Sequence, residues 1–393
     1  MRNEFHTEVD CRQKNHHDSR ICGDVFLSRM IKEEKRIIAV LSDGMGHGVK
    51  ANILATLSST MALNFTIEHK EIERIAEIIM NTLPVCAERK ISYATFSIID
   101  IDSQGFTRIL EYDNPLAIIF RGPAVFTPRW EKVMLKGENH SGKILNTCSF
   151  TATLEDRIVI MSDGIVQSGM GSEKHPFGWG RENVESYALS LIAGDPTISA
   201  TALSSKILNM AHKNDGYQLK DDASCATVYF REPRKLLICT GPPFDSEKDR
   251  VLAGIVENFI GRVILSGGTT ADIIARELER KINDNLEFTD PELPPESFME
   301  GIELVTEGIL TLQKVSRIID IYPNHTPGKG PADKIVKLIM DSDEISFIIG
   351  TRINEAHQDP TLPVDLEIRR NVVRRIAAML EEKWLKQVDL EYI

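Results

Sequence analysis

The chain has 393 residues, more than a single ordinary domain, and its length predicts two domains. Its 42% hydrophobic and 26% charged residues are typical of a soluble globular protein, and a net charge of −12 argues against general nucleic-acid binding. No apolar run approaches the roughly 20 residues that span a bilayer, and no signal-peptide core is present. The six cysteines form no C-x-x-C pair. We therefore expect a cytoplasmic protein that binds neither membrane nor nucleic acid.

The first part of the chain combines apolar runs with helical patterns. Helices are expected at 49–64, where Ala51, Leu54, Ala55, Leu57, Ser58 and Met61 form an apolar face, at 71–89, and near 181–213. Runs rich in Ile, Val and Phe predict strands at 21–28, 36–42, 93–100, 106–111, 116–121, 157–162 and 225–231. Blocks of strands with helices between them predict an α+β fold of two antiparallel sheets covered by helices.

The segment Glu232-Pro233-Arg234-Lys235 predicts a junction between a domain at 1–232 and another at 235–393. In the second domain strands and helices alternate along the chain, which indicates a smaller α/β domain with some parallel pairing. The expected strands are 236–240, 262–265 and 345–350, and the expected helices are 246–258, 271–282 and 363–387.

Three short acidic motifs lie far apart in the first domain. Two follow apolar runs, Ser42-Asp43-Gly44-Met45-Gly46-His47-Gly48 and Met161-Ser162-Asp163-Gly164, and one precedes such a run, Lys220-Asp221-Asp222-Ala223-Ser224. A single Asp-Gly after a strand is more often a plain turn than a ligand. Three such carboxylates drawn from strand ends are what a hard divalent cation needs, so together they favour a Mg²⁺ or Mn²⁺ site.

With Ile21-Cys22-Gly23-Asp24 before them and Tyr93-Ala94-Thr95-Phe96 between them, these motifs resemble, in order, those of metal-dependent protein phosphatases. The likeness is to the PPM (protein phosphatase 2C-like) superfamily, and within it to the bacterial stage II sporulation protein E type. It covers roughly residues 1–232 and implies a four-layer α/β/β/α sandwich.

The resemblance also implies a site and a reaction. Asp43 would bridge two divalent ions, Mn²⁺ or Mg²⁺, and the Gly44 carbonyl would bind one of them; Asp163 and Asp221 would complete the other, and Asp24 would reach a metal directly or through water. Whether Asp221 or Asp222 is the ligand stays open, with Asp221 favoured by register. The implied activity is hydrolysis of phosphoserine or phosphothreonine by metal-activated water in bacterial signalling. Relatives often act on anti-sigma-antagonist proteins, so the expected partner is a phosphoprotein of that kind.

The sequence departs from the family pattern at several places. Eukaryotic relatives carry a histidine, a candidate general acid, where this chain has Met45; whether His47 replaces it is left open. The bacterial type usually has a Gly-Ser-Pro or Gly-His-Pro turn where this chain has Asp113-Asn114-Pro115, and Asp and Asn also suit a turn. His16 and His17 are expected to be exposed loop residues rather than ligands.

In the second domain, Ser266-Gly267-Gly268-Thr269-Thr270 follows a strand and opens a helix. One interpretation is a pocket for a phosphate-bearing or carboxylate ligand, because backbone N–H groups and the helix dipole attract anions there. The other is a tight turn with Thr270 capping the helix. An alternative function follows from the first: a catalytically silent scaffold whose C-terminal domain binds a nucleotide or other anionic ligand. The oligomeric state stays open, a dimer included.

Overall fold

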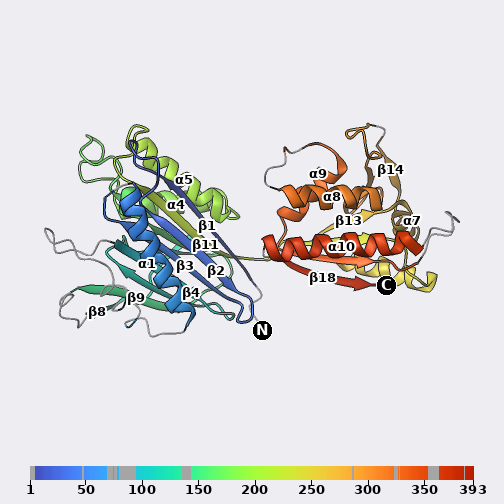
Figure 1. Cartoon of the computed structure of the whole chain (residues 1–393), viewed down its shortest axis with the longest axis horizontal. Helices are drawn as coiled ribbons and strands as arrows, with labels where there is room; N and C mark the ends of the chain where they lie inside the picture. Colours follow the sequence, from blue (N-terminus) through green and yellow to red (C-terminus); the bar gives the residue numbers. More distant parts are fainter. Residues whose placement is uncertain are drawn as a thin grey trace. The chain divides into compact units, whose positions relative to one another are not determined.

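The computed structural model describes residues 5–46, 48–68, 74, 78, 94–134, 143–285, 287–322, 326, 328–352, 363–384 and 386–393. The chain divides into two compact units, Met1–Glu232 and Pro233–Ile393 (Figure 1). Among the described helices, none combines the length and the apolar character needed to cross a membrane. The helix expected at 71–89 lies almost entirely outside the described residues.

Two antiparallel sheets form the centre of the first unit. In sheet order, the six-stranded sheet contains β2 (Val25–Ile31), β3 (Arg36–Gly44), β4 (Ala94–Ile101), β5 (Phe106–Tyr112), β9 (Ile144–Thr151) and β8 (Glu131–Met134). The five-stranded sheet contains β1 (His6–Lys14), β11 (Ala223–Arg231), β10 (Asp156–Met161), β6 (Ile118–Arg121) and β7 (Ala124–Phe126).

Helices cover the outer faces of both sheets. Because successive side chains of a strand point to opposite faces, Val40 of β3 packs under α1 (Val49–Ile67), whereas Leu41 packs between the two sheets. On the other side, α4 (Arg181–Gly194) and α5 (Ala200–Asn214) cover the five-stranded sheet (Figure 1). This order of layers, helix, sheet, sheet and helices, confirms the predicted α/β/β/α sandwich.

Several elements differ from the sequence-based expectation. The stretch near 181–213 is two helices, since residues 195–199 interrupt it. Leu57, assigned to the buried face of the first helix, is 42% exposed. That helix packs instead through small residues such as Ala51, Ala55 and Ser58, which let it lie close to β3. The strand expected at 21–28 begins only at Val25.

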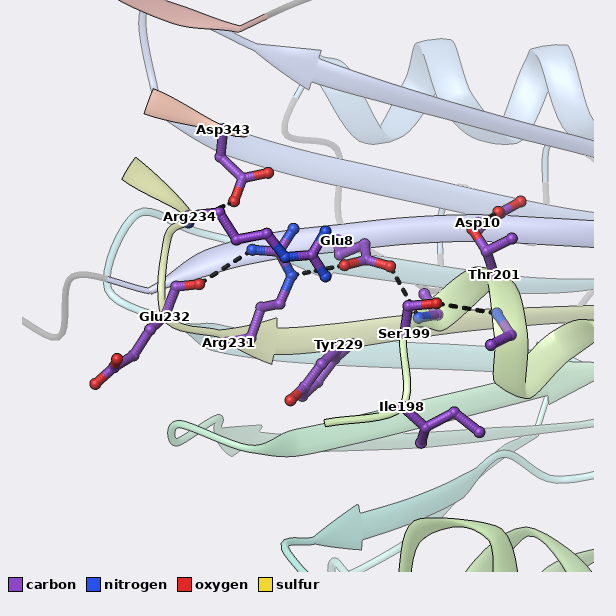
Figure 2. A network of polar contacts seen from close by, with 12 residues as sticks. Glu8, Asp10, Ile198, Ser199, Thr201, Tyr229, Arg231, Glu232, Arg234 and Asp343 are labelled. Carbon is purple, nitrogen blue, oxygen red and sulfur yellow. Dashed lines mark hydrogen bonds and ion pairs between the residues drawn. The ribbon is translucent and has the colours of Figure 1, made fainter. Parts of the chain in front are cut away.

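Strand β1 was not expected, and a polar network fixes it against β11 and α5. The Glu8 carboxylate accepts hydrogen bonds from Arg231 Nε at 2.6 Å and from the Ala200 N–H at 2.9 Å. Figure 2 shows this network, in which Thr201 also donates to Asp10 and Ser199 caps α5. The network holds the strand from which the chain runs through residues 15–23 to Asp24.

The second unit is built on a mainly parallel sheet. In sheet order its strands are β14 (Ile282–Asp284), β15 (Ser297–Met299), β16 (Ile302–Thr306), β13 (Arg262–Ser266), β12 (Lys235–Thr240), β17 (Glu344–Ile349) and β18 (Gln387–Tyr392). The strands from β16 to β18 are parallel, and β14 and β15 add an antiparallel edge.

Helices pack on both faces of this sheet, as parallel sheets require. One face carries α6 (Asp249–Asn258), which directly follows the short 3-10 helix η1 (Ser246–Lys248), and α7 (Gly268–Glu277). The other face carries α8 (Ile309–Ile321), α9 (Pro331–Met340) and α10 (Pro363–Trp384). The predicted α/β class is confirmed. The closing helix ends earlier than expected, because the last residues form β18 beside β17.

Candidate metal centre

Two neighbouring strands bring Asp24 and Asp43 together. Strands β2 and β3 are antiparallel with Val25 opposite Ser42, so Asp24, which precedes β2, lies beside Asp43 near the end of β3. Asp24 is 2% exposed and Asp43 is half-buried. The two motifs, separated by the turn between the strands, therefore place two carboxylates at one end of the six-stranded sheet.

The other two motifs meet at one end of the five-stranded sheet. Strand β10 pairs with β11, and the pairing continues beyond Met161, where the Ser162 N–H donates to the Ser224 carbonyl at 3.0 Å. In return, the Ser224 N–H donates to Ser162 Oγ at 2.9 Å. Asp163 opens the short helix α3 (Asp163–Val166) directly after this contact. Asp221 and Asp222 directly precede β11.

A hydroxyl of the five-stranded sheet holds a carboxylate that lies at the end of the six-stranded sheet. Ser224 Oγ donates to Asp24 Oδ2 at 2.5 Å, although the two residues are 200 positions apart. The structure thus gathers Asp24, Asp43 and Asp163 with the Asp221–Asp222 pair, as the sequence motifs predicted for a metal site. Their roles as ligands remain a prediction.

Two glycines permit the close approach of backbone to this cluster. A Cβ atom on Gly164 would lie 2.1 Å from the carbonyl oxygen of Asp222, and one on Gly44 would lie 2.1 Å from the carbonyl oxygen of Ala51. No side chain fits at such distances. The glycine that follows each acidic residue in the first two motifs is therefore required by packing.

Three carboxylates of the cluster share one pattern: one oxygen is held and the other is not. Ser224 holds Asp24, Gln167 Nε2 donates to Asp163 Oδ2 at 2.7 Å, and the His16 N–H donates to Asp222 Oδ1 at 2.9 Å. The second oxygens, Asp24 Oδ1, Asp163 Oδ1 and Asp222 Oδ2, are buried and accept no hydrogen bond from the described residues. In metal sites, neighbouring residues usually donate hydrogen bonds to the ligands. Such a bond to one oxygen of a carboxylate leaves the other oxygen for the cation.

The electrostatics of the cluster also favour a cation. Burial raises the pKa of Asp43 well above its ordinary value, and the negative charges of Asp24, Asp163 and Asp221 raise it further. Burial raises the pKa of Asp24 to about 7, against the lowering effect of hydrogen bonds from Ser224 and Ser162. Since full ionisation of these groups is costly in the protein alone, oxygen ligands of this kind fit a hard divalent cation.

A thiol nucleophile is not favoured here. Cys22 lies next to the cluster, and burial, with the charges of Asp24 and Asp222, raises the pKa of its thiol far above the ordinary value. A raised pKa keeps the sulfur protonated and unreactive. Cys22 is therefore not a candidate nucleophile.

Three expectations near the cluster had different outcomes. His47 lies outside the described residues. His17 is exposed as expected, but His16 is half-buried because its N–H is bonded to Asp222. With Asp18, the two histidines bring potential ligand atoms within 4.8 Å of one another. The sequence did not indicate Gln167 as the residue that holds Asp163, although the spacing of four residues on a helical turn is a usable signal.

A buried polar chain supports the strand beside Asp43. Glu111 accepts two hydrogen bonds of 3.1 Å from the Ala117 N–H and one of 3.3 Å from Ser97 Oγ. Asn114 donates to Ser97 Oγ and accepts from Thr95, the residue opposite Asp43 in the sheet. The turn that contains Asn114 is confirmed, since Asp113 has a φ of 56°.

We expect Glu111 to make stability depend on pH. Burial raises its pKa from 4.5 to about 8, so the folded protein keeps a proton that the unfolded chain releases. Stability from this group is full below pH 4.5 and is lost as the pH rises to about 8. The melting temperature of Glu111→Gln minus that of the parent, measured by calorimetry, should therefore be larger at pH 8.5 than at pH 5. The exposed Glu173→Gln serves as the control, and a difference that does not change with pH would contradict the assignment.

Comparison with known proteins places these residues in a family. The model of the family described as stage II sporulation protein E (SpoIIE) matches residues 33–231, a span that contains Asp43, Asp163 and Asp221. No curated protein matches the chain.

Several solved structures are similar to part of the chain. The phosphatase domain with a regulatory fragment of Bacillus subtilis SpoIIE is 17% identical over 58% of this chain and 64% of that one, with a TM-score of 0.47. The RsbU and RsbW domains of a Mycobacterium tuberculosis protein are 16% identical over 64% and 67%, with a TM-score of 0.46. RsbX in complex with magnesium is 20% identical over 58% and 96%, with a TM-score of 0.41. The chain thus spans less than two thirds of the first of these structures.

Proposed function

The chain belongs to the stage II sporulation protein E family, and we propose that its first unit is a metal-dependent phosphatase that hydrolyses phosphoserine or phosphothreonine in a partner protein. One observation carries the proposal: buried carboxylates from both sheets converge, each with one oxygen held by a hydrogen bond and another that accepts none. The cluster lies within or beside the part of the chain that the family model matches.

Each residue has a proposed part. Asp43, Asp163 and Asp221, with the Gly44 carbonyl and Asp24, would hold two divalent ions, Mn²⁺ or Mg²⁺. When bound, such ions supply an acidified water as nucleophile and neutralise the charge of the phosphoryl group. Ser224 and Gln167 fix the orientation of Asp24 and Asp163 through the hydrogen bonds they donate. Asp221 is preferred to Asp222 because its charge acts on Asp43, as the register of the sequence motif also predicts.

We propose a phosphoprotein of the anti-sigma-antagonist kind as the substrate, in a bacterial regulatory switch. The support for this partner is family membership alone. The site itself supports a narrower statement, that a phosphate ester is the reacting group.

The proposal is tested with a chromogenic aryl phosphate ester. We expect the chelator-treated full chain to be inactive, and Mn²⁺ or Mg²⁺ to restore hydrolysis in a saturable way. A protein that binds the ions but hydrolyses neither the ester nor a phosphoserine peptide would instead be the silent signalling scaffold.

His47 is a candidate for the proton donor to the leaving group. An alkoxide leaving group such as serine needs a proton, whereas a nitrophenolate does not. We therefore expect His47→Ala to slow hydrolysis of a phosphoserine peptide by roughly a hundredfold and to change the rate with an activated aryl ester little. The ratio of the two rates is the readout, and equal losses on both substrates would remove His47 from the mechanism.

A further inference from the structure

The strand order of the second unit marks one edge of its sheet. In chain order the parallel strands are β12, β13, β16, β17 and β18, and in the sheet they lie as β16-β13-β12-β17-β18. The sheet therefore grows first to one side of β12 and then to the other. In open parallel sheets, ligands bind outside the carboxyl ends of the strands at the point where the order reverses. Here that point lies at the ends of β12 and β17.

A row of buried hydroxyl groups lies along this edge. Thr240, Ser266 and Thr306 are paired in register across β12, β13 and β16, and all three are at most 4% exposed. Ser266 Oγ donates to the carbonyls of Glu307 and Gly308, and Thr306 Oγ1 donates to that of Glu307. Thr240 Oγ1 has no hydrogen-bond partner among the described residues.

Two more hydroxyls at the same edge are buried and, like that of Thr240, have no hydrogen-bond partner among the described residues. Thr270 in the first turn of α7 and Thr311 in the first turn of α8 are fully buried, and neither Oγ1 has a partner in the described part of the chain. The capping role considered for Thr270 is therefore wrong: α7 has no side-chain cap, because its N-cap residue is Gly267. Buried polar groups are normally satisfied, so unsatisfied hydroxyls gathered at one edge indicate a ligand.

The turn between β13 and α7 offers backbone donors at the same edge of the sheet. The first N–H groups of a helix have no partner within it, and α7 begins at Gly268. A Cβ atom on Gly267 would lie 3.4 Å from Thr270 Oγ1, so this hydroxyl faces the turn, whereas a Cβ on Gly268 would contact nothing within 4 Å. The turn after β12 differs, since Pro242 and Pro243 have no N–H to donate.

A cation lies beside the end of β12. Gly241 directly follows Thr240, and a Cβ atom on Gly241 would lie 2.6 Å from Nη1 of Arg369 on α10. The guanidinium therefore packs on the turn that follows Thr240. The turn after β17 is close as well, because a Cβ on Gly350 would lie 2.1 Å from the Pro242 carbonyl oxygen. Hydroxyls, helix N–H groups and a guanidinium are the donors that bind phosphate groups in proteins.

We propose that this edge binds the phosphate group of a small molecule, with Thr240, the Gly267–Thr270 turn and Arg369 as its contacts. The site belongs to the second unit and does not depend on the phosphatase centre. In dinucleotide-binding folds the glycine-rich phosphate-binding turn follows the first parallel strand. Here the proposed turn follows the second parallel strand, so the site differs from a dinucleotide-binding site.

The test uses calorimetric titration of the full chain in the presence of a chelator, which removes metal-dependent phosphate binding at the first unit. Inorganic phosphate, glucose 6-phosphate, AMP and ATP are the probes, and their ranking distinguishes a site for phosphate alone from one for a nucleotide or sugar phosphate. We expect saturable binding of at least one probe, weakened tenfold or more in Thr240→Val and in Gly268→Val.

Both variants should fold, since among the described residues the Thr240 hydroxyl has no partner to lose and a Cβ atom on Gly268 meets no atom within 4 Å. Exposed Thr289→Val is the matched control and should bind as the parent does. The proposal would be overturned if Thr240→Val and Gly268→Val bound the probes as strongly as the parent does. It would also be overturned if no probe bound to the parent in a saturable way.

Discussion

Replacing Asp43 by asparagine should abolish metal-dependent phosphate release, with a loss of at least about a hundredfold, and Asp163→Asn should do the same. Changes to residues that only hold metal ligands cost about 10- to 100-fold, so removal of a ligand charge should cost no less. Without metal both variants should melt higher than the parent, because burial and neighbouring negative charges raise the pKa of Asp43, and burial raises that of Asp163. Rates on an aryl ester and melting temperatures in chelator are the two measurements.

Asp102→Asn is the matched control. Asp102 is exposed, and its Oδ1 accepts hydrogen bonds from the Gln104 and Phe106 N–H groups, which an asparagine oxygen can also accept. Its rate and melting temperature should equal those of the parent. Activity within about tenfold of the parent in either site variant would contradict the metal mechanism.

Gly164→Ala is expected to damage both the fold and the site. Its Cβ would lie 2.1 Å from the carbonyl oxygen and 3.0 Å from the carbonyl carbon of Asp222, which are backbone atoms and can move only with the start of β11. Overpacking of this kind costs about 1–3 kcal/mol. The displaced segment carries Asp221, so metal binding should weaken as well. Urea unfolding and Mn²⁺ affinity measure the two effects.

Gly194→Ala makes the same chemical change where space is open. Gly194 is the last residue of α4, and a Cβ there would meet nothing within 4 Å. Alanine in a helix is favoured over glycine by about 0.5–1 kcal/mol, so this variant should be as stable as the parent or more so. If Gly164→Ala were equally harmless, the close contact between α3 and β11 would be wrong.

Local sequence patterns predicted the strands and helices in which buried positions carry apolar side chains at regular spacing. The buried strand β3 and the helix after it were found from apolar runs and helical spacing, and the acidic motifs were found because each directly follows or precedes such a run. Strand β1 was missed because its sequence is mostly polar and lacks an apolar run. It forms a strand by pairing with β11, which lies more than 200 residues later in the chain.

Contacts between distant residues account for most of the rest. Nothing near Asp24 in the sequence points to Ser224, yet the hydrogen bond between them joins the two sheets at the site. In the second unit, the pattern around Thr270 suggested a helix cap, but the helix starts two residues earlier and leaves its hydroxyl buried. Register across a sheet, which aligns Thr240 with Ser266, is likewise invisible in a local pattern.

The most direct test of the proposed metal centre is equilibrium binding of Mn²⁺ to the chelator-treated full chain, measured by electron paramagnetic resonance of the free ion. We expect saturable binding of two ions per chain, lost or much weakened in Asp43→Asn and unchanged in Asp102→Asn. A parent protein that binds no Mn²⁺ in a saturable way, or an Asp43→Asn variant that binds it equally well, would contradict the claim that these carboxylates form a metal centre.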